Sequence, residues 1–69
     1  MEESYKMATT TKIESGVYEM SAHGHTWHIE RWEANPSLWI GFALDLHDVS
    51  VGPADTKSLI VSFITNWSK

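Results

Sequence analysis

Apolar and polar positions alternate through the first half of the chain and predict β-strands. The alternation runs through Gly16–Ala22 and again through Thr26–Trp32. Strict alternation is typical of a strand with one buried face. Between the two segments, His23-Gly24-His25 places a glycine where a tight turn needs one. The two segments therefore predict a β-hairpin, and we expect its buried face to carry Tyr18, Met20, Trp27 and Ile29. Burial of the first strand through Val17 stays open as an alternative, because a slip of one residue would exchange the two faces.

A third strand is predicted over Leu38–Leu46, the most apolar alternating segment of the chain. It follows a turn at Ala34–Ser37, where the Asn-Pro pair disfavours helix. Asp48–Gly52 is open to two interpretations, a loop or a short strand. We expect the alternate residues with the bulkier side chains in the third strand to face the core, and the other alternate residues to lie on the open face. The expected inward set is Leu38, Ile40, Phe42 and Leu44, and the expected outward set is Trp39, Gly41, Ala43 and Asp45.

A helix is predicted at the C-terminal end of the chain. Gly52–Thr56 breaks the alternation, and Asp55 or Thr56 can accept hydrogen bonds from the first free amides of a helix. The residues that follow form one apolar stripe at helical spacing: Leu59, Ile60, Phe63, Ile64 and Trp67.

The predicted fold is α+β. It has a three-stranded, or four-stranded, antiparallel β-meander with one C-terminal α-helix packed on one face. Residues 1–11 are polar and predict a flexible N-terminal tail, and residues 12–69 form a single domain.

Composition limits how such a small domain can be stabilised. The chain has 69 residues, 42% of them hydrophobic, and no cysteine, so neither a disulfide nor a thiolate zinc site can form. Four tryptophans supply large apolar side chains instead. Oligomerisation is a second route to burying surface, and a homodimer is one expectation.

Charge and hydropathy exclude several function classes. The chain has no apolar stretch of about 18 residues, and residues 1–11 lack the apolar centre of a signal peptide. We therefore expect a cytoplasmic protein without membrane contact. Nine acidic residues against five basic ones give a formal net charge of −4. That charge provides no general attraction for phosphate backbones, so direct nucleic-acid binding is not expected.

Enzyme chemistry has no motif in this sequence. Ser15 and Ser50 lack the context of a nucleophile elbow, and the four glycines are scattered without a phosphate-binding loop. We expect a protein that is not an enzyme and carries no cofactor.

The candidate binding residues lie on the sheet face that one helix cannot cover. Tryptophan is enriched in binding hot spots, and acidic neighbours select a basic partner surface. The alternative is that the tryptophans pack within the domain. The predicted partner-binding set is Trp32, Trp39, Glu19, Glu30, Glu33 and His28.

The histidines raise a second hypothesis, a metal site. His23, His25 and His47 are the candidate ligands, because imidazole and carboxylate bind zinc or nickel. The competing interpretation is that they are polar residues at a solvent-exposed hairpin tip. The spacing of a helical zinc motif is absent, so no metal is expected.

The order of the segments resembles small accessory proteins of phages and prophages, which combine a short meander, an aromatic strand and a closing helix. The segments that carry the resemblance are Ile13–Tyr18, Trp27–Ile29, Trp39–Phe42 and Thr56–Leu59. The resemblance covers residues 13–67 and is one of layout, so no site residue follows from it. It implies an inhibitor of the anti-CRISPR or anti-restriction kind that binds a host or defence protein in the host cytoplasm.

The expected function is therefore a small non-enzymatic protein-interaction module. Its partner would be a host protein such as a nucleic-acid-processing enzyme, which it would block by steric and electrostatic exclusion of the substrate. Two alternatives stay open: a β-sheet nucleic-acid-binding module and a histidine-based metal-binding protein.

Overall fold

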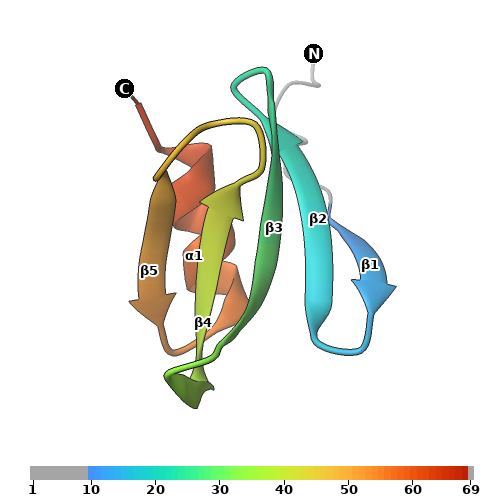
Figure 1. The fold of residues 1–69 in the computed structure, drawn as a ribbon, viewed down its shortest axis with the longest axis vertical. Helices are drawn as coiled ribbons and strands as arrows, with labels where there is room; N and C mark the ends of the chain where they lie inside the picture. Colours follow the sequence, from blue (N-terminus) through green and yellow to red (C-terminus); the bar gives the residue numbers. More distant parts are fainter. Residues whose placement is uncertain (1–9, 69) are drawn as a thin grey trace.

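Five strands form one antiparallel sheet in chain order, and a single helix follows them (Figure 1). The computed structural model describes residues 10–68. The elements are β1 (Thr11–Glu14), β2 (Val17–Ala22), β3 (His25–Trp32), β4 (Asn35–Ala43), β5 (Ser50–Ala54) and α1 (Lys57–Thr65). The predicted α+β class, antiparallel sheet and C-terminal helix are confirmed. The predicted number of strands, three or four, was too low.

The two ends of the sheet account for the difference. β5 occupies part of the segment for which a loop and a short strand were both considered, and it pairs with β4. β1 begins at Thr11, the last residue of the predicted tail, and pairs with β2 through an irregular register. Residues 1–9 of the predicted tail lie outside the described residues.

The β2–β3 hairpin is the one that the alternation predicts. Met20 lies opposite Trp27 and Tyr18 opposite Ile29. His23 and Gly24 form the turn, and both have positive φ, 57° and 77°. Two consecutive residues with positive φ suit the right-handed twist of the flanking strands.

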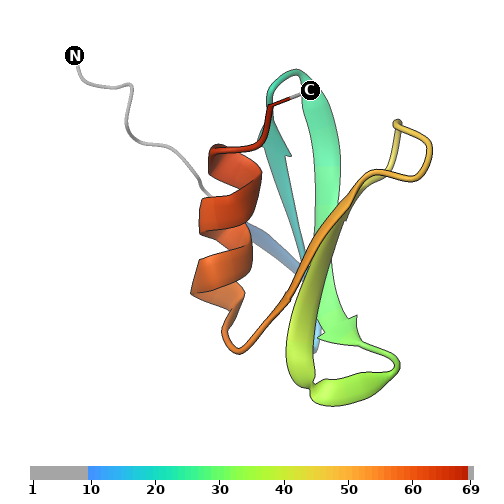
Figure 2. The ribbon, with the colours of Figure 1, turned by 90° about the vertical axis from the view of Figure 1, so that its left-hand side faces the viewer.

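Helix α1 lies along one face of the sheet and leaves the other face open (Figure 2). Thr56 is its N-cap, and the Oγ1 of Thr56 accepts a hydrogen bond from the Leu59 amide at 3.1 Å. The buried line of the helix passes through Ile60 and Ile64. Leu59 and Phe63, which the sequence placed in the same stripe, are 44% and 42% exposed. Within residues 10–68, no helix has the length and hydropathy needed to cross a membrane.

The faces of β4 are the reverse of the prediction. Gly41 lies opposite Ile29 and Ala43 opposite Trp27, so the small residues of β4 lie under the helix. The bulky Ile40 and Phe42, predicted to be inward, therefore lie on the open face. The leading cause is the close approach of α1. A Cβ atom on Gly41 would lie 2.7 Å from Ile60 Cγ2 and 3.1 Å from Ile64 Cδ1.

Trp27 is the largest side chain of the core and is fully buried. Its indole Nε1 donates a hydrogen bond to the Ala22 carbonyl at 3.1 Å, which satisfies its polar atom. The ring of Trp67, just beyond the helix, packs edge-on against it with centroids 5.3 Å apart. Trp67 thus closes the core at the end of the sheet that carries the β2–β3 turn.

Gly41→Ala tests the close approach of helix and sheet. The added methyl group overlaps the β-branched Ile60, which has little rotamer freedom in a helix, so the helix must move away. We expect a loss of about 1–3 kcal/mol in the free energy of unfolding, measured by urea denaturation. Ser21→Ala, at an exposed position of β2, should change it by less than about 0.5 kcal/mol. Equal stability of Gly41→Ala and the parent chain would contradict the packing described.

Candidate functional site

The open face of the sheet is built from cross-strand rows of side chains on β2, β3 and β4. One row runs Glu19–His28–Phe42, and the next runs Val17–Glu30–Ile40. These six residues define the open face, and all are partly buried. Since alternate residues of a strand point to opposite faces, they lie on the side away from α1. This face therefore combines apolar side chains with carboxylates.

The first row is held by direct side-chain contacts. His28 Nε2 lies 3.5 Å from Glu19 Oε2, and the His28 ring meets the Phe42 ring edge-on with centroids 5.9 Å apart. Cross-strand pairs of this kind stabilise a sheet. The row fixes the positions of an acid and an aromatic ring on the surface.

An open hollow of about 290 Å³ lies beside this row, near the β3–β4 turn. The register shifts between Arg31 and Trp32, and Trp32 lies opposite Asn35. A bulge of this kind re-aims the side chains around it. The hollow is lined by Glu30, Arg31, Trp32, Glu33, Ile40 and Phe42. Its apolar lining of Trp32, Ile40 and Phe42 is bordered by the two glutamates.

Most of the predicted partner-binding residues meet at this surface. Glu19, His28 and Glu30 lie on the open face, and Trp32 and Glu33 line the hollow.

Trp39 is the exception, and its predicted place on the open face was wrong. It lies opposite Arg31, packs against the core and stacks obliquely with Tyr18 at 6.2 Å. The physical reason is that the two faces of β4 are reversed: Gly41 and Ala43 face the helix, and Trp39 lies on the same face as they do.

Ile40 and Phe42 are the surface residues that sequence reasoning missed. Both faces of β4 carry apolar residues, and the prediction placed the face with the larger side chains inside. The two faces could be distinguished by Gly41 and Ala43, since small residues mark the face of a strand that another element approaches closely.

The histidine candidates for a metal site take part in separate interactions. His23 Nε2 donates a hydrogen bond to the carbonyl of Ile64 at 2.7 Å, near the end of α1. His25 Nδ1 donates to Asp45 Oδ2 at 2.9 Å. His47 is 95% exposed in its side chain. In the part of the chain that the structure describes, no group of three or more metal-ligating side chains comes together.

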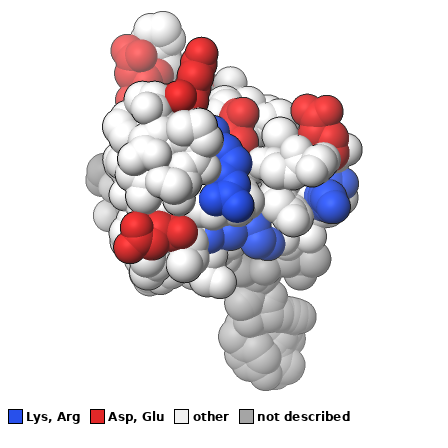
Figure 3. Space-filling model, turned by 90° about the horizontal axis from the view of Figure 1, so that it is seen from below, with Lys and Arg blue, Asp and Glu red and all other residues white. Residues whose placement is uncertain are grey.

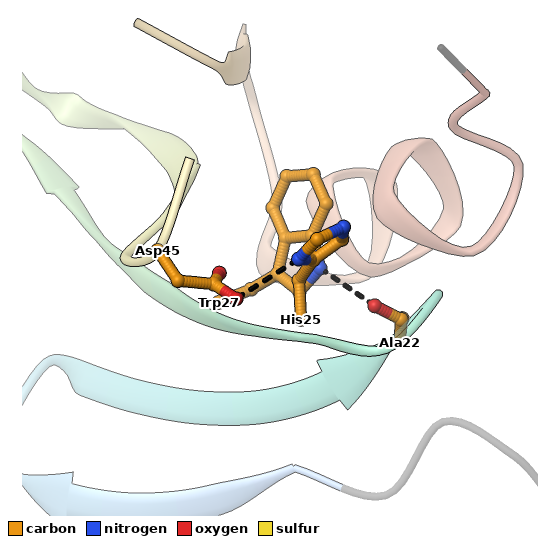
Figure 4. Close-up of polar contacts among 4 residues, drawn as sticks. All are labelled: Ala22, His25, Trp27 and Asp45. Atoms are coloured by element: carbon orange, nitrogen blue, oxygen red, sulfur yellow. Dashed lines mark hydrogen bonds and ion pairs between the residues drawn. The ribbon is translucent and has the colours of Figure 1, made fainter. Parts of the chain in front are cut away.

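The His25–Asp45 pair ties the β2–β3 hairpin to the loop between β4 and β5 (Figure 4). Both His23 and His25 also lie against the Trp67 ring, at 5.6 and 6.1 Å between centroids. The hydrogen bond from His25 lowers the pKa of Asp45 below its ordinary value of 3.8. His23 and His25 therefore join chain segments through hydrogen bonds, while His23 stays exposed at the hairpin turn.

Comparisons with known proteins leave the site to be judged on its own geometry. No family model matches the chain, and no curated protein or solved structure matches it.

Asp45→Asn tests the fastening through its pH dependence. Because the pKa of Asp45 is lowered by folding, the ionised group stabilises the fold above pH 3.8, and this contribution is lost as pH falls through the lowered value. In urea unfolding, we expect the parent chain to be more stable than Asp45→Asn at about pH 6 and the two to converge towards about pH 2.

Asp48→Asn is the matched control, since the Asp48 side chain is 85% exposed and asparagine tolerates its positive φ of 59°. Its difference from the parent chain should be small at every pH. A stability difference between the parent chain and Asp45→Asn that stays constant with pH would refute the role of the pair.

Proposed function

We propose that this protein is a small non-enzymatic interaction module that binds a partner protein through the open face of its sheet. The observation that carries the proposal is the hollow beside Trp32, with its apolar lining and two bordering carboxylates. A pocket of this kind accepts one anchoring side chain of a partner, and such anchors dominate the binding energy of protein interfaces.

The chemistry of the hollow selects a lysine or an arginine as that anchor. The aliphatic stem of a basic side chain packs on apolar surface while its charged head stays near water and carboxylates. Trp32 adds a ring that attracts a cation. Glu30 and Glu33 can accept hydrogen bonds from the charged head, which is the strongest class of hydrogen bond.

The surroundings of the hollow extend the same preference. Glu19 adds a third carboxylate on the open face. The guanidinium of Arg31 lies 4.2 Å from the centre of the Trp39 ring, on the covered side of the sheet. The guanidinium of Arg31 is thus engaged with the Trp39 ring, although Arg31 also lines the hollow, and the three carboxylates of this surface favour a basic partner surface.

The partner class follows from this charge preference. Proteins that process nucleic acids carry basic surfaces, and a module that covers such a surface excludes the substrate sterically and electrostatically. This supports the inhibitor function that the resemblance to phage accessory proteins implies.

A basic peptide probes the hollow directly. We expect an acetylated penta-arginine peptide, titrated into the isotope-labelled chain, to shift NMR signals of the Trp32 indole and of the amides of Glu30 and Phe42. The double variant Glu30→Gln/Glu33→Gln should weaken this binding roughly tenfold, because two charge-assisted contacts are lost.

Asp48→Asn is the control, since the Asp48 side chain is 85% exposed in the loop between β4 and β5, at the opposite end of β4 from the hollow. It should leave the shifts at Trp32 in place. Shifts spread evenly over all acidic regions, or equal affinity of the double variant, would overturn the proposal. Self-association of the chain that buries Trp32 and excludes the peptide would overturn it in favour of a homodimer.

A further inference from the structure

Three basic side chains gather on the covered side of the sheet, at the end that carries the β3–β4 turn. Lys12, Arg31 and Lys57 come from β1, β3 and α1, and they are all the lysines and arginines of residues 10–68. Figure 3 views the molecule from this end and shows lysine and arginine side chains there, interspersed with acidic ones. The three cations thus come from segments far apart in the sequence.

Two aromatic rings carry two of these cations, and the third lies on the strand beside them. Lys57 Nζ lies 4.1 Å from the centre of the Tyr18 ring, and Arg31 Cζ lies 4.2 Å from that of Trp39. The two rings are neighbours, 6.2 Å apart, and Lys12 lies opposite Tyr18 in the sheet. We call these five residues the cation–aromatic cluster.

The cluster is not neutralised by carboxylates within the described part of the chain. All ion pairs found among residues 10–68 involve a histidine: His25, His28 and His47. No carboxylate of these residues lies within 4.0 Å of a charged nitrogen of Lys12, Arg31 or Lys57. Gathering like charges is unfavourable.

The rings hold the cations in place and leave their polar edges available. A guanidinium stacked on an indole still presents its planar donors to a ligand, in a geometry that matches two oxygens of an oxyanion. Lys57 adds a point charge over the neighbouring Tyr18 ring, and its Nζ also donates to Thr10 Oγ1 at 3.4 Å. The cluster therefore offers a fork of donors and an ammonium on two neighbouring rings.

We propose that the cation–aromatic cluster binds a phosphate group of a nucleotide or of a nucleic-acid strand. The terminal phosphate of a nucleotide carries close to two negative charges and three acceptor oxygens, and a strand presents one negative charge at each successive phosphodiester, so either ligand can match more than one cation. A single carboxylate carries one charge and would leave the other cations unmatched. The ring faces of Tyr18 and Trp39 are occupied by cations, so recognition acts on phosphate and not on the bases.

This site is separate from the proposed protein-binding function, because its charged groups point to the other side of the sheet. The Arg31 guanidinium lies over the Trp39 ring, although Arg31 is also among the residues that line the hollow. Lys57 is not among them, so Lys57→Gln is the variant that tests the cluster without changing the hollow.

The test uses the full chain at low ionic strength with two phosphate probes, inorganic pyrophosphate and a fluorescent oligothymidylate. We expect both to bind, and Arg31→Gln or Lys57→Gln to weaken binding roughly three- to tenfold. For the oligothymidylate, the logarithm of the affinity should fall with the logarithm of salt concentration with a slope of about two at most, since only three cations are available. Each variant should lower that slope.

His47→Glu is the matched control, because it lowers the net charge by one in the exposed loop between β4 and β5. It should leave binding within about twofold of the parent chain. Thermal unfolding of each variant shows that it folds, and Lys57→Gln keeps the test valid if Arg31→Gln does not.

The two probes also distinguish the sources of the phosphate. Binding of pyrophosphate alone supports a free nucleotide, and binding of oligothymidylate alone supports a strand. Absence of binding to both overturns the proposal. So does equal binding to a polyglutamate peptide, which would assign the cluster to acidic protein segments, or equal weakening by His47→Glu.

Discussion

The close contact between helix α1 and strand β4 is the constraint on which the arrangement of this protein depends. Ile60 lies directly over Gly41 and also over Gly52 of β5, where an added Cβ would come within 2.7 Å of its Cδ1. Only strand positions without side chains allow such an approach. Once Gly41 and Ala43 face the helix, Ile40 and Phe42 must face the other way. The apolar lining of the open face thus results from the packing of the core.

How far the sequence predicts this structure depends on whether the apolar residues of a strand fall on one of its faces or on both. In β2 and β3 the hairpin follows from the alternation, but the alternation left open whether β2 is buried through Tyr18 or Val17, and the structure packs Tyr18 against the core. Local chemistry predicted an N-cap at Asp55 or Thr56, and Thr56 is the cap. In β4 both faces carry apolar residues. Which face is buried depends on how closely helix α1 approaches the strand, and this helix lies elsewhere in the sequence. Trp39, one of the predicted partner-binding residues, was therefore assigned to the wrong face of the sheet.

Long-range contacts explain the other differences between sequence and structure. Histidines at a glycine turn are typical of an exposed tip, yet His23 reaches Ile64 across 41 residues and His25 reaches Asp45 across 20. The same holds for charge. A net charge of −4 argues against an anion site, but the net value conceals the gathering of Lys12, Arg31 and Lys57 at one place. Sequence order carries no direct record of such neighbours.

The polar and charged side chains make different kinds of contact at the two ends of the sheet. At the β2–β3 turn, histidines, Asp45 and Trp67 contact one another and the helix end, so polar groups are used for fastening. At the β3–β4 turn, the cations lie on rings and the glutamates border a hollow. A small domain needs most of its side chains for its own stability. Charges that are not used in this way are therefore the groups most available to a ligand. Because alternate residues of β3 point to opposite faces, Glu30 and Arg31 lie on opposite sides of the sheet.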